Sequence, residues 1–295
     1  MAFSETDKLS LSSILRRYWM QVGVTWGLTF VETAVLAVMP LFIGWSIDGL
    51  LANDWNPFLS LIGLFVGILV VATARRVYDT RAYGTIRVAM GETQANRSDE
   101  KPVSVVNARI LMGRELVDFL EFEAPMAMTS LVQVLASIGI LLSFHYLLAG
   151  SAFGSVVLIL LIYAAFSKLF FRLNSQLNEQ SEQQIHALES RSPKEIAAHF
   201  LGLRRQEVRL SDTESLVYGI IFAVLLTMLG FNLWFSASQT GASAGNIFSI
   251  VTYSLEFLQS AVALPAALQS LTRLSEITER INQVEDESED EASSD

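Results

Sequence analysis

Long apolar runs alternate along the chain with polar connections of two very different lengths. Six of these runs are long enough to cross a bilayer, since about 20 residues at 1.5 Å each span a hydrocarbon core of about 30 Å. They are Val22–Ile47, Pro57–Ala74, Pro125–Ser143, Tyr146–Phe166, Leu216–Phe235 and Ile247–Leu271. The pattern predicts an all-α integral membrane protein with six transmembrane helices.

Basic residues fall only in alternate connections. All 20 lysines and arginines lie before the first apolar segment, between the second and third, between the fourth and fifth, or after the sixth. The other three connections, Asp48–Asn56, Phe144–His145 and Ser236–Asn246, contain none. Because cytoplasmic flanks keep positive charge, we expect both termini in the cytoplasm. The cytoplasmic connections Arg75–Ala124 and Ser167–Ser215 are far longer than turns, which predicts long helical extensions.

The second extension carries a helix-start signal at Ser192-Pro193-Lys194-Glu195, with serine as N-cap, proline at the first position and glutamate completing a capping box. The helix it opens, Ile196–Leu201, is expected to end at Gly202, and a further helix from about Leu203 returns to the membrane. One face of the preceding helix is marked by Leu173, Leu177 and Leu188.

The first extension is predicted to have two helical arms, Arg75–Met90 and Val103–Glu123, joined by a polar turn over Gly91–Pro102. We expect Glu121 and Glu123, which precede Pro125, at the inner rim of the membrane.

Two carboxylates interrupt the apolar segments. Glu32 and Glu256 each lie about 10 residues from the start of a predicted helix, which is about 15 Å deep and near the bilayer centre. An acid at that depth should face protein or water. Helical spacing agrees, because Thr29 shares a face with Glu32, and Tyr253 and Gln259 share a face with Glu256. Three interpretations stay open: a hydrogen-bonded structural carboxyl, recognition of a cationic or amphipathic substrate, and a proton-coupling site.

Composition narrows the class further. The chain is 52% hydrophobic and 17% charged, with mean hydropathy +0.42, which favours a membrane protein over a soluble domain. It has no cysteine, so neither a disulfide nor a thiolate metal site is predicted, and no cofactor is expected. Residues 285–295 hold seven acids and no base; removing their −7 from the net charge of −10 leaves about −3. No basic surface for nucleic acid is visible.

Several short motifs resemble the membrane domain of type I ATP-binding-cassette (ABC) exporters. An amphipathic segment, residues 11–19, precedes the first membrane helix as the family's elbow helix does, and that helix ends Pro40-Leu-Phe-Ile-Gly44-Trp-Ser-Ile-Asp48. Gly241 and Gly245 introduce the last helix, and Tyr253 follows at the familiar distance. Glu279-Arg280-Ile281 is similar to the family's close. We expect Asp48 to hydrogen-bond the outer turn.

The resemblance implies a domain plan. Residues 1–21 would be the cytoplasmic N-terminus with the elbow helix, 22–272 the six-helix ABC-exporter-like domain, 273–284 a short C-terminal helix, and 285–295 a disordered acidic tail. It further implies a homodimer in a bacterial inner membrane, with a central cavity lined by the first and sixth helices. The predicted substrate or proton pathway is then Glu32, Glu256, Thr29, Tyr253 and Gln259.

The family's ATPase binds at the tip of the second extension. Carried onto this chain, the resemblance assigns docking to Pro193, Lys194, Glu195, Ile196, His199 and Phe200. A phosphate-binding Gly-x-x-x-x-Gly-Lys sequence does not occur, so no enzymatic activity is expected of this chain itself.

Three functions follow from these features. The first is a transport membrane subunit for an unknown small-molecule or peptide substrate, driven by a separate ABC ATPase subunit. The second is an ATP-independent, proton-coupled carrier of peptide-like or amphipathic cargo on the same fold. The third is a membrane scaffold or assembly partner that transports nothing.

Overall fold

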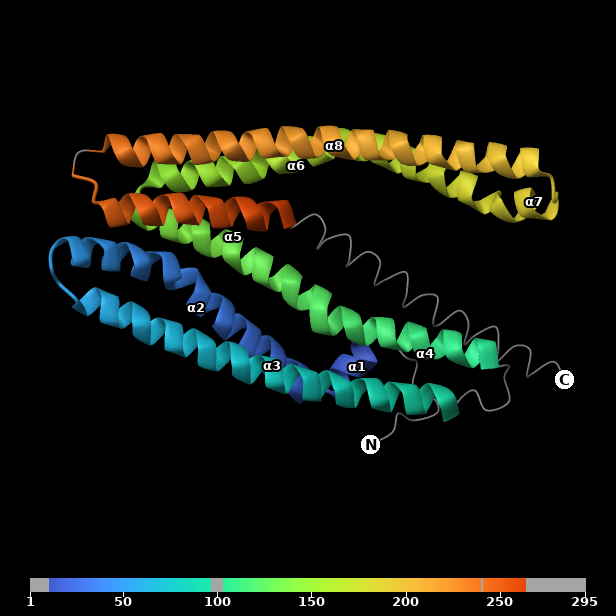
Figure 1. The fold of residues 1–295 in the computed structure, drawn as a ribbon, viewed down its shortest axis with the longest axis horizontal. Helices are drawn as coiled ribbons and strands as arrows, with labels where there is room; N and C mark the ends of the chain where they lie inside the picture. The colour runs from blue at the N-terminus through green and yellow to red at the C-terminus, as the bar shows by residue number, and fades with distance from the viewer. Residues whose placement is uncertain (1–10, 97–102, 240, 264–295) are drawn as a thin grey trace. The chain divides into compact units, whose positions relative to one another are not determined.

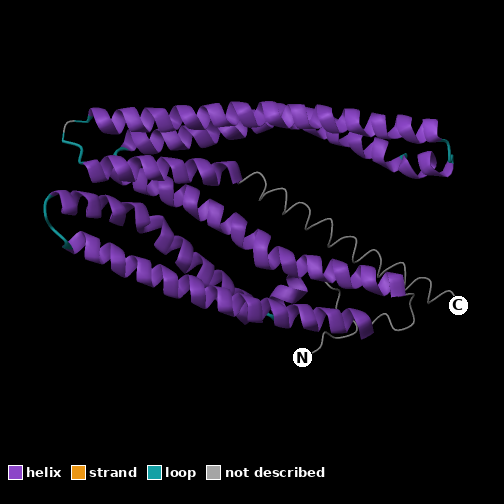
Figure 2. Ribbon diagram, viewed as in Figure 1, coloured by secondary structure: helices purple, strands orange, loops and turns teal. Residues whose placement is uncertain are grey.

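The computed structural model describes residues 11–96, 103–239 and 241–263, and within them the chain is helical throughout, with short connections (Figures 1 and 2). In chain order the helices are α1 (Leu11–Arg17), α2 (Trp19–Leu51), α3 (Asn56–Asn96), α4 (Val103–Asp118), the π-helix η1 (Phe119–Glu123), α5 (Ala124–Phe144), α6 (Tyr146–Glu182), α7 (Gln184–Glu189) and α8 (Pro193–Ser238). A last helix covers residues 244–263. The predicted all-α class is confirmed.

Five of the helical stretches in the described residues are long and apolar enough to cross a membrane, where the sequence predicted six. They are Trp19–Leu51, Asn56–Asn96, Gly113–Phe144, Tyr146–Glu189 and Pro193–Ser238. The helix over residues 244–263 is the described part of the sixth predicted segment, and the remainder of that segment, 264–271, lies outside the described residues. The predicted C-terminal helix (273–284) and the predicted acidic tail (285–295) lie outside the described residues as well. The chain is therefore a multi-pass membrane protein.

The chain divides into two compact units, one made of Met1–Ile140 with Thr240–Asp295 and the other of Leu141–Gln239. In the first unit α2 and α3 form an antiparallel hairpin (Figure 1). The short helix α1 is separated from α2 by Tyr18 alone. Ile14 of α1 is fully buried in a cluster with residues of α3 and α4, among them Ile86 and Leu116, while Arg16 is exposed. Helix α1 is thus amphipathic, and its role as an entry helix stays a prediction.

The sequence motifs of the first and last helices meet in this unit. Asp48 accepts hydrogen bonds from the Ser243 hydroxyl at 2.6 Å and from the Gly245 N–H at 2.8 Å, so it caps the start of the helix over residues 244–263. A Cβ added to Gly245 would lie 2.0 Å from the carbonyl oxygen of Gly44. Glycine is therefore needed at both positions, because the backbones of Gly44 and Gly245 approach each other too closely for a Cβ atom. The prediction that Asp48 bonds the outer turn is confirmed.

In the second unit α6 and α8 run side by side, with α7 at one end (Figure 1). Helix α8 begins at Pro193 with Ser192 as its N-cap, as predicted, although the serine side chain makes no capping bond. The predicted end at Gly202 is wrong, because α8 continues to Ser238. Gly202 instead lies against the Gln180 side chain, which a Cβ would approach to 3.1 Å. The glycine allows close packing of α8 on α6 and does not end a helix.

Two further predictions about the extensions are corrected. The short helix of the second extension is α7, which precedes Pro193, and Leu188 belongs to it; Leu188 is 49% exposed, whereas Leu173 is buried in α6. Leu188 therefore does not extend the apolar face of α6. In the first extension α3 runs to Asn96, so residues 91–96 are helical and not part of a turn. Residues 97–102 lie outside the described residues.

Candidate functional site

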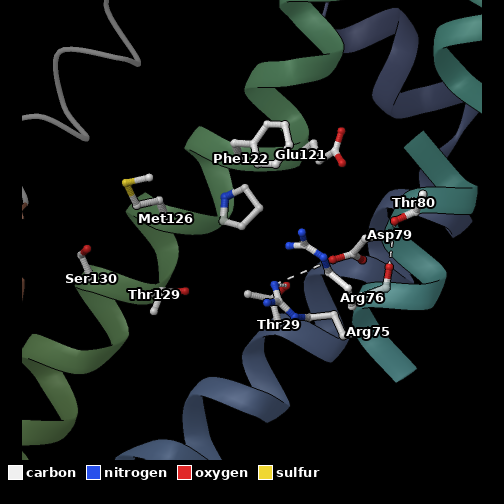
Figure 3. A pocket seen from close by; sticks show the side chains of 11 residues that line it. Thr29, Arg75, Arg76, Asp79, Thr80, Glu121, Phe122, Met126, Thr129 and Ser130 are labelled. Carbon is white, nitrogen blue, oxygen red and sulfur yellow. Dashed lines mark hydrogen bonds and ion pairs between the residues drawn. The ribbon is translucent and has the colours of Figure 1, made fainter. Parts of the chain in front are cut away.

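A cavity of about 340 Å³ opens in the first unit between α2, α3 and the junction of η1 with α5 (Figure 3). Its lining combines both charges, hydroxyls and apolar groups: Thr29 from α2; Arg75, Arg76, Asp79 and Thr80 from α3; Glu121 and Phe122 from η1; and Pro125, Met126, Thr129 and Ser130 from α5. The volume lies at the lower end of the range for small-molecule sites. Such a lining suits a small amphipathic molecule that carries charge.

Arg75 holds the polar wall of this cavity together. Its guanidinium forms an ion pair with Glu32 and donates to the Thr29 hydroxyl at 3.3 Å. Asp79, one turn further along α3, lies 3.8 Å from Arg75. The side chains of Glu32 and Asp79 are each 16% exposed and that of Arg75 is 27% exposed. Charges that are withdrawn from water to this extent must be paired, and here they are.

The ion pair also corrects the predicted depth of Glu32. Glu32 and Arg75 each lie 19 residues from their ends of the α2–α3 turn, about 28 Å along the helices. Arg75 directly follows the apolar segment that ends at Ala74. Glu32 therefore lies at the level where that apolar segment ends, and not at its centre. Helix α2 therefore extends beyond the level at which the apolar segment of α3 ends.

A π-turn shapes the opposite wall. The Ala124 N–H bonds to the Phe119 carbonyl five residues back, and Pro125 has no N–H to give. The Leu120 carbonyl is thereby left without a backbone donor. Buried Tyr83 supplies one, with its hydroxyl 2.9 Å from the Leu120 oxygen. The indole of Trp26 approaches the same oxygen at 3.5 Å. The backbone irregularity is thus satisfied by side chains from α2 and α3.

A second ion-pair group adjoins the cavity on the side of α4. Arg87 donates to the Asp118 carboxylate at 2.6 Å and forms an ion pair with Glu121. Glu121 also lines the cavity. Arg87 therefore ties α3 to the π-helix, whose Phe122 lines the cavity.

Glu256 has a different partner. Its carboxylate accepts a hydrogen bond of 2.5 Å from the side chain of Gln133 in α5. Glu256 lies 12 residues into the helix that begins at 244, and Gln133 lies 11 residues before the end of α5 at Phe144. These separations correspond to about 17–18 Å along the two helices. Glu32 and Glu256 make separate polar contacts.

The other predicted pathway residues have different surroundings. Thr29 lines the cavity. Tyr253 is fully buried, and its hydroxyl donates to the Ala37 carbonyl at 2.7 Å, so it joins the last helix to α2. Gln259 is exposed on the helix over residues 244–263.

The predicted docking residues form the first two turns of α8, in the second unit. Pro193, Lys194, Glu195 and Phe200 are exposed, and Ile196 is half-buried. His199 is 7% exposed, and its Nδ1 lies 3.1 Å from the side-chain nitrogen of Gln180 in α6. His199 thus contributes to the packing of α8 on α6, while its neighbours are accessible to a partner.

Sequence reasoning missed most of the cavity wall. The sequence pattern identifies Arg75 only as a marker of topology, although a buried acid in the preceding helix needs a cationic partner. The spacing of Arg75 and Asp79 by one turn was an available signal. The contributions of Thr129 and Ser130 depend on how α5 is rotated about its axis, which no local pattern specifies.

A family model described as ABC transporter transmembrane region matches residues 11–245. The chain belongs to this family. No curated protein matches the chain. The ABC transporter transmembrane region is a component of membrane transport, so the predicted class of protein is confirmed at that level.

The family match covers some of the predicted site residues and not others. The ABC transporter transmembrane region covers Glu32, Thr29 and Arg75, together with the first turns of α8. Glu256, Tyr253 and Gln259 lie beyond residue 245, where the match ends. The cavity beside Arg75 and the exposed start of α8 therefore both fall within the part of the chain that defines the family.

Proposed function

We propose that this chain is the membrane-spanning half of a transporter, which works as a homodimer and is driven by an ABC ATPase on a separate subunit. The observation that carries the proposal is an exposed apolar surface at the tip of the second unit. Phe200 and Leu201 of α8 are 45% and 55% exposed, and Ile185 and Leu188 of α7 are 67% and 49% exposed.

Lipid does not account for this exposure. Leu201 lies 15 residues before Leu216, where the apolar segment of α8 begins, which is about 22 Å along the helix. That distance exceeds the thickness of the head-group layer. Apolar side chains gathered in water indicate a protein interface. These apolar residues lie before and after Pro193, Lys194 and Glu195 in the chain, which supports the predicted ATPase contact.

The homodimer is supported by Gln259. It lies 15 residues into the helix over 244–263, about 22 Å from its start, and its side chain is exposed in the single chain. An amide inside the hydrocarbon layer should face protein or water. A second copy of the chain facing this helix would place protein and water next to the Gln259 side chain. Since the chain has no cysteine, Gln259→Cys introduces a single thiol, and we expect it to form a disulfide-linked dimer in membranes. Leu226→Cys, on the exposed face of α8, should stay monomeric.

The substrate path in this proposal includes the cavity beside Glu32 and Thr29 and the Glu256–Gln133 contact. The mixture of two arginines, two acids and the apolar Phe122 and Met126 supports an amphipathic substrate, peptide-like or of similar size. Tyr253 contributes by fixing the last helix to α2, because its hydroxyl is already bonded to Ala37.

Co-purification tests the proposal. The full chain is isolated in mild detergent, and bound proteins are identified by mass spectrometry and by ATP hydrolysis. We expect a P-loop ATPase with the unmodified chain and its loss with Phe200→Asp. Val208→Asp is the matched control, because Val208 is 46% exposed on the same helix but lies outside the tip. Absence of any ATPase, or equal loss with both variants, would contradict the proposal.

The Glu256–Gln133 contact favours a second candidate, the proton-coupled carrier. A carboxyl near the bilayer centre with one amide partner can exchange a proton when its surroundings change. Proteoliposomes that contain a pH-sensitive dye would then show substrate-dependent proton entry without ATP, and Glu256→Gln would abolish it. Proton entry that persists in Glu256→Gln excludes this role for Glu256.

A further inference from the structure

A second cavity, of about 400 Å³, lies in the second unit between α6 and α8. Two arginines from different helices line it, Arg172 of α6 and Arg209 of α8. Its walls also include Leu169 and Leu173 and the carboxylate of Asp212. This cavity shares no residue with the cavity of the first unit and contains none of the docking residues.

Neither arginine has an ion-pair partner among the residues that the structure describes, and both are exposed. This contrasts with Arg75 and Arg87, which pair with acids in the first unit. A guanidinium offers five N–H donors in a planar fork that matches a phosphate group. Two such forks that line one cavity from neighbouring helices are suited to one phosphate.

The level of this cavity indicates the source of the phosphate. Arg172 follows the end of the apolar segment at Phe166 by six residues, and Arg209 precedes the next apolar segment at Leu216 by seven. Both Cα atoms thus lie about 9–11 Å beyond the hydrocarbon along their helices. Arginine side chains are long enough to reach back into the head-group layer. Phe171, beside Arg172, is 80% exposed and offers an apolar contact for lipid.

We propose that this cavity binds the phosphodiester of a membrane glycerophospholipid, with the phosphate between Arg172 and Arg209 and the acyl chains along the apolar part of α6. The charges agree with this ligand. Two arginines and Asp212 give a net charge of +1, which matches one singly charged phosphodiester. Basic pockets between membrane helices at this interface are suited to lipid head groups.

Native mass spectrometry of the full chain in detergent tests the assignment, with dioleoyl phosphatidylglycerol as the probe. Each arginine near the surface contributes roughly a fivefold change in affinity. We therefore expect the double variant Arg172→Gln/Arg209→Gln to bind the lipid roughly 25-fold more weakly than the unmodified chain. The double variant Arg204→Gln/Arg205→Gln is the matched control, since both residues lie on α8 outside the cavity and are exposed. It should bind as the unmodified chain does.

A second measurement separates the lipid from free phosphate. Inorganic phosphate added in excess should leave lipid binding unchanged if the acyl chains contribute, and should displace the lipid if the cavity is a site for the free anion. Thermal unfolding of each variant without lipid checks that the fold is retained. Equal lipid binding by both double variants, or displacement by inorganic phosphate, would overturn the proposal.

Discussion

Replacing Tyr83 by phenylalanine tests why the chain can hold a π-turn at the cavity wall. The Tyr83 hydroxyl lies 2.9 Å from the Leu120 carbonyl oxygen and is fully buried. After Tyr83→Phe only the indole of Trp26 remains, at 3.5 Å, the limit of a hydrogen bond. A buried acceptor without a partner costs about 1–3 kcal/mol, and hydrogen bonds between membrane helices contribute up to about 1.7 kcal/mol. We expect the free energy of unfolding to fall by about 1.5 kcal/mol.

The size of this loss should depend on Pro125. Pro125→Ala restores an N–H at position 125, which can bond the Leu120 carbonyl or let the segment return to α-helix. In that background Tyr83→Phe should cost about 0.5 kcal/mol or less, because the carbonyl now has a backbone donor. The double-mutant cycle should therefore give a coupling energy of about 1 kcal/mol.

Unfolding of the full chain in mixed micelles by titration with sodium dodecyl sulfate, followed by far-UV circular dichroism, measures these values. Tyr146→Phe is the control, because Tyr146 is 67% exposed and should lose less than about 0.5 kcal/mol. If Tyr83→Phe costs the same with proline and with alanine at position 125, the missing N–H does not explain the Tyr83 contact.

The remaining predictions concern the ion pair and the glycine contact. Glu32→Gln and Arg75→Gln should each lower the free energy of unfolding by about 1–3 kcal/mol, and the double variant by less than their sum, because no unpaired charge is left; additive losses would contradict a specific pair. Gly245→Ala should cost about 1–3 kcal/mol, because the added Cβ lies 2.0 Å from the Gly44 oxygen, whereas Gly230→Ala, with nothing within 4 Å, should not destabilise. Equal thermal shifts in the two glycine variants would contradict the close approach.

Hydropathy and charge predicted much of the fold. The apolar runs have the length of membrane helices, and the start of α8 follows from the serine–proline signal at Ser192 and Pro193. In the sequence, Gly44, Asp48 and Gly245 belong to separate motifs. The structure shows that they form a single contact between α2 and the helix over residues 244–263. Their pairing joins positions about 200 residues apart, which local patterns cannot specify.

Other features depended on tertiary contacts. Gly202 has the residue type of a helix end, but the side chain of Gln180 occupies the space that its missing Cβ leaves. In a sequence, a glycine that ends a helix cannot be distinguished from a glycine that lets two helices pack closely. The partner of Glu32 depends on the register of α2 against α3, which the turn between them sets. The π-turn before Pro125 could not be predicted from local sequence. It depends on hydrogen-bond donors that Tyr83 and Trp26 bring from other helices.

The central claim, a transport cavity whose access an ATPase controls, is tested most directly by the accessibility of the cavity wall. Thr129→Cys places a single thiol in the cavity of this cysteine-free chain, and Leu160→Cys places one on an exposed apolar position of α6. Both are treated in native membranes with a water-soluble maleimide, with and without ATP and vanadate. We expect Thr129→Cys to be labelled without nucleotide and protected in the trapped state, and Leu160→Cys to be unlabelled throughout. Labelling of Thr129→Cys that is absent, or the same in both states, would contradict the central claim.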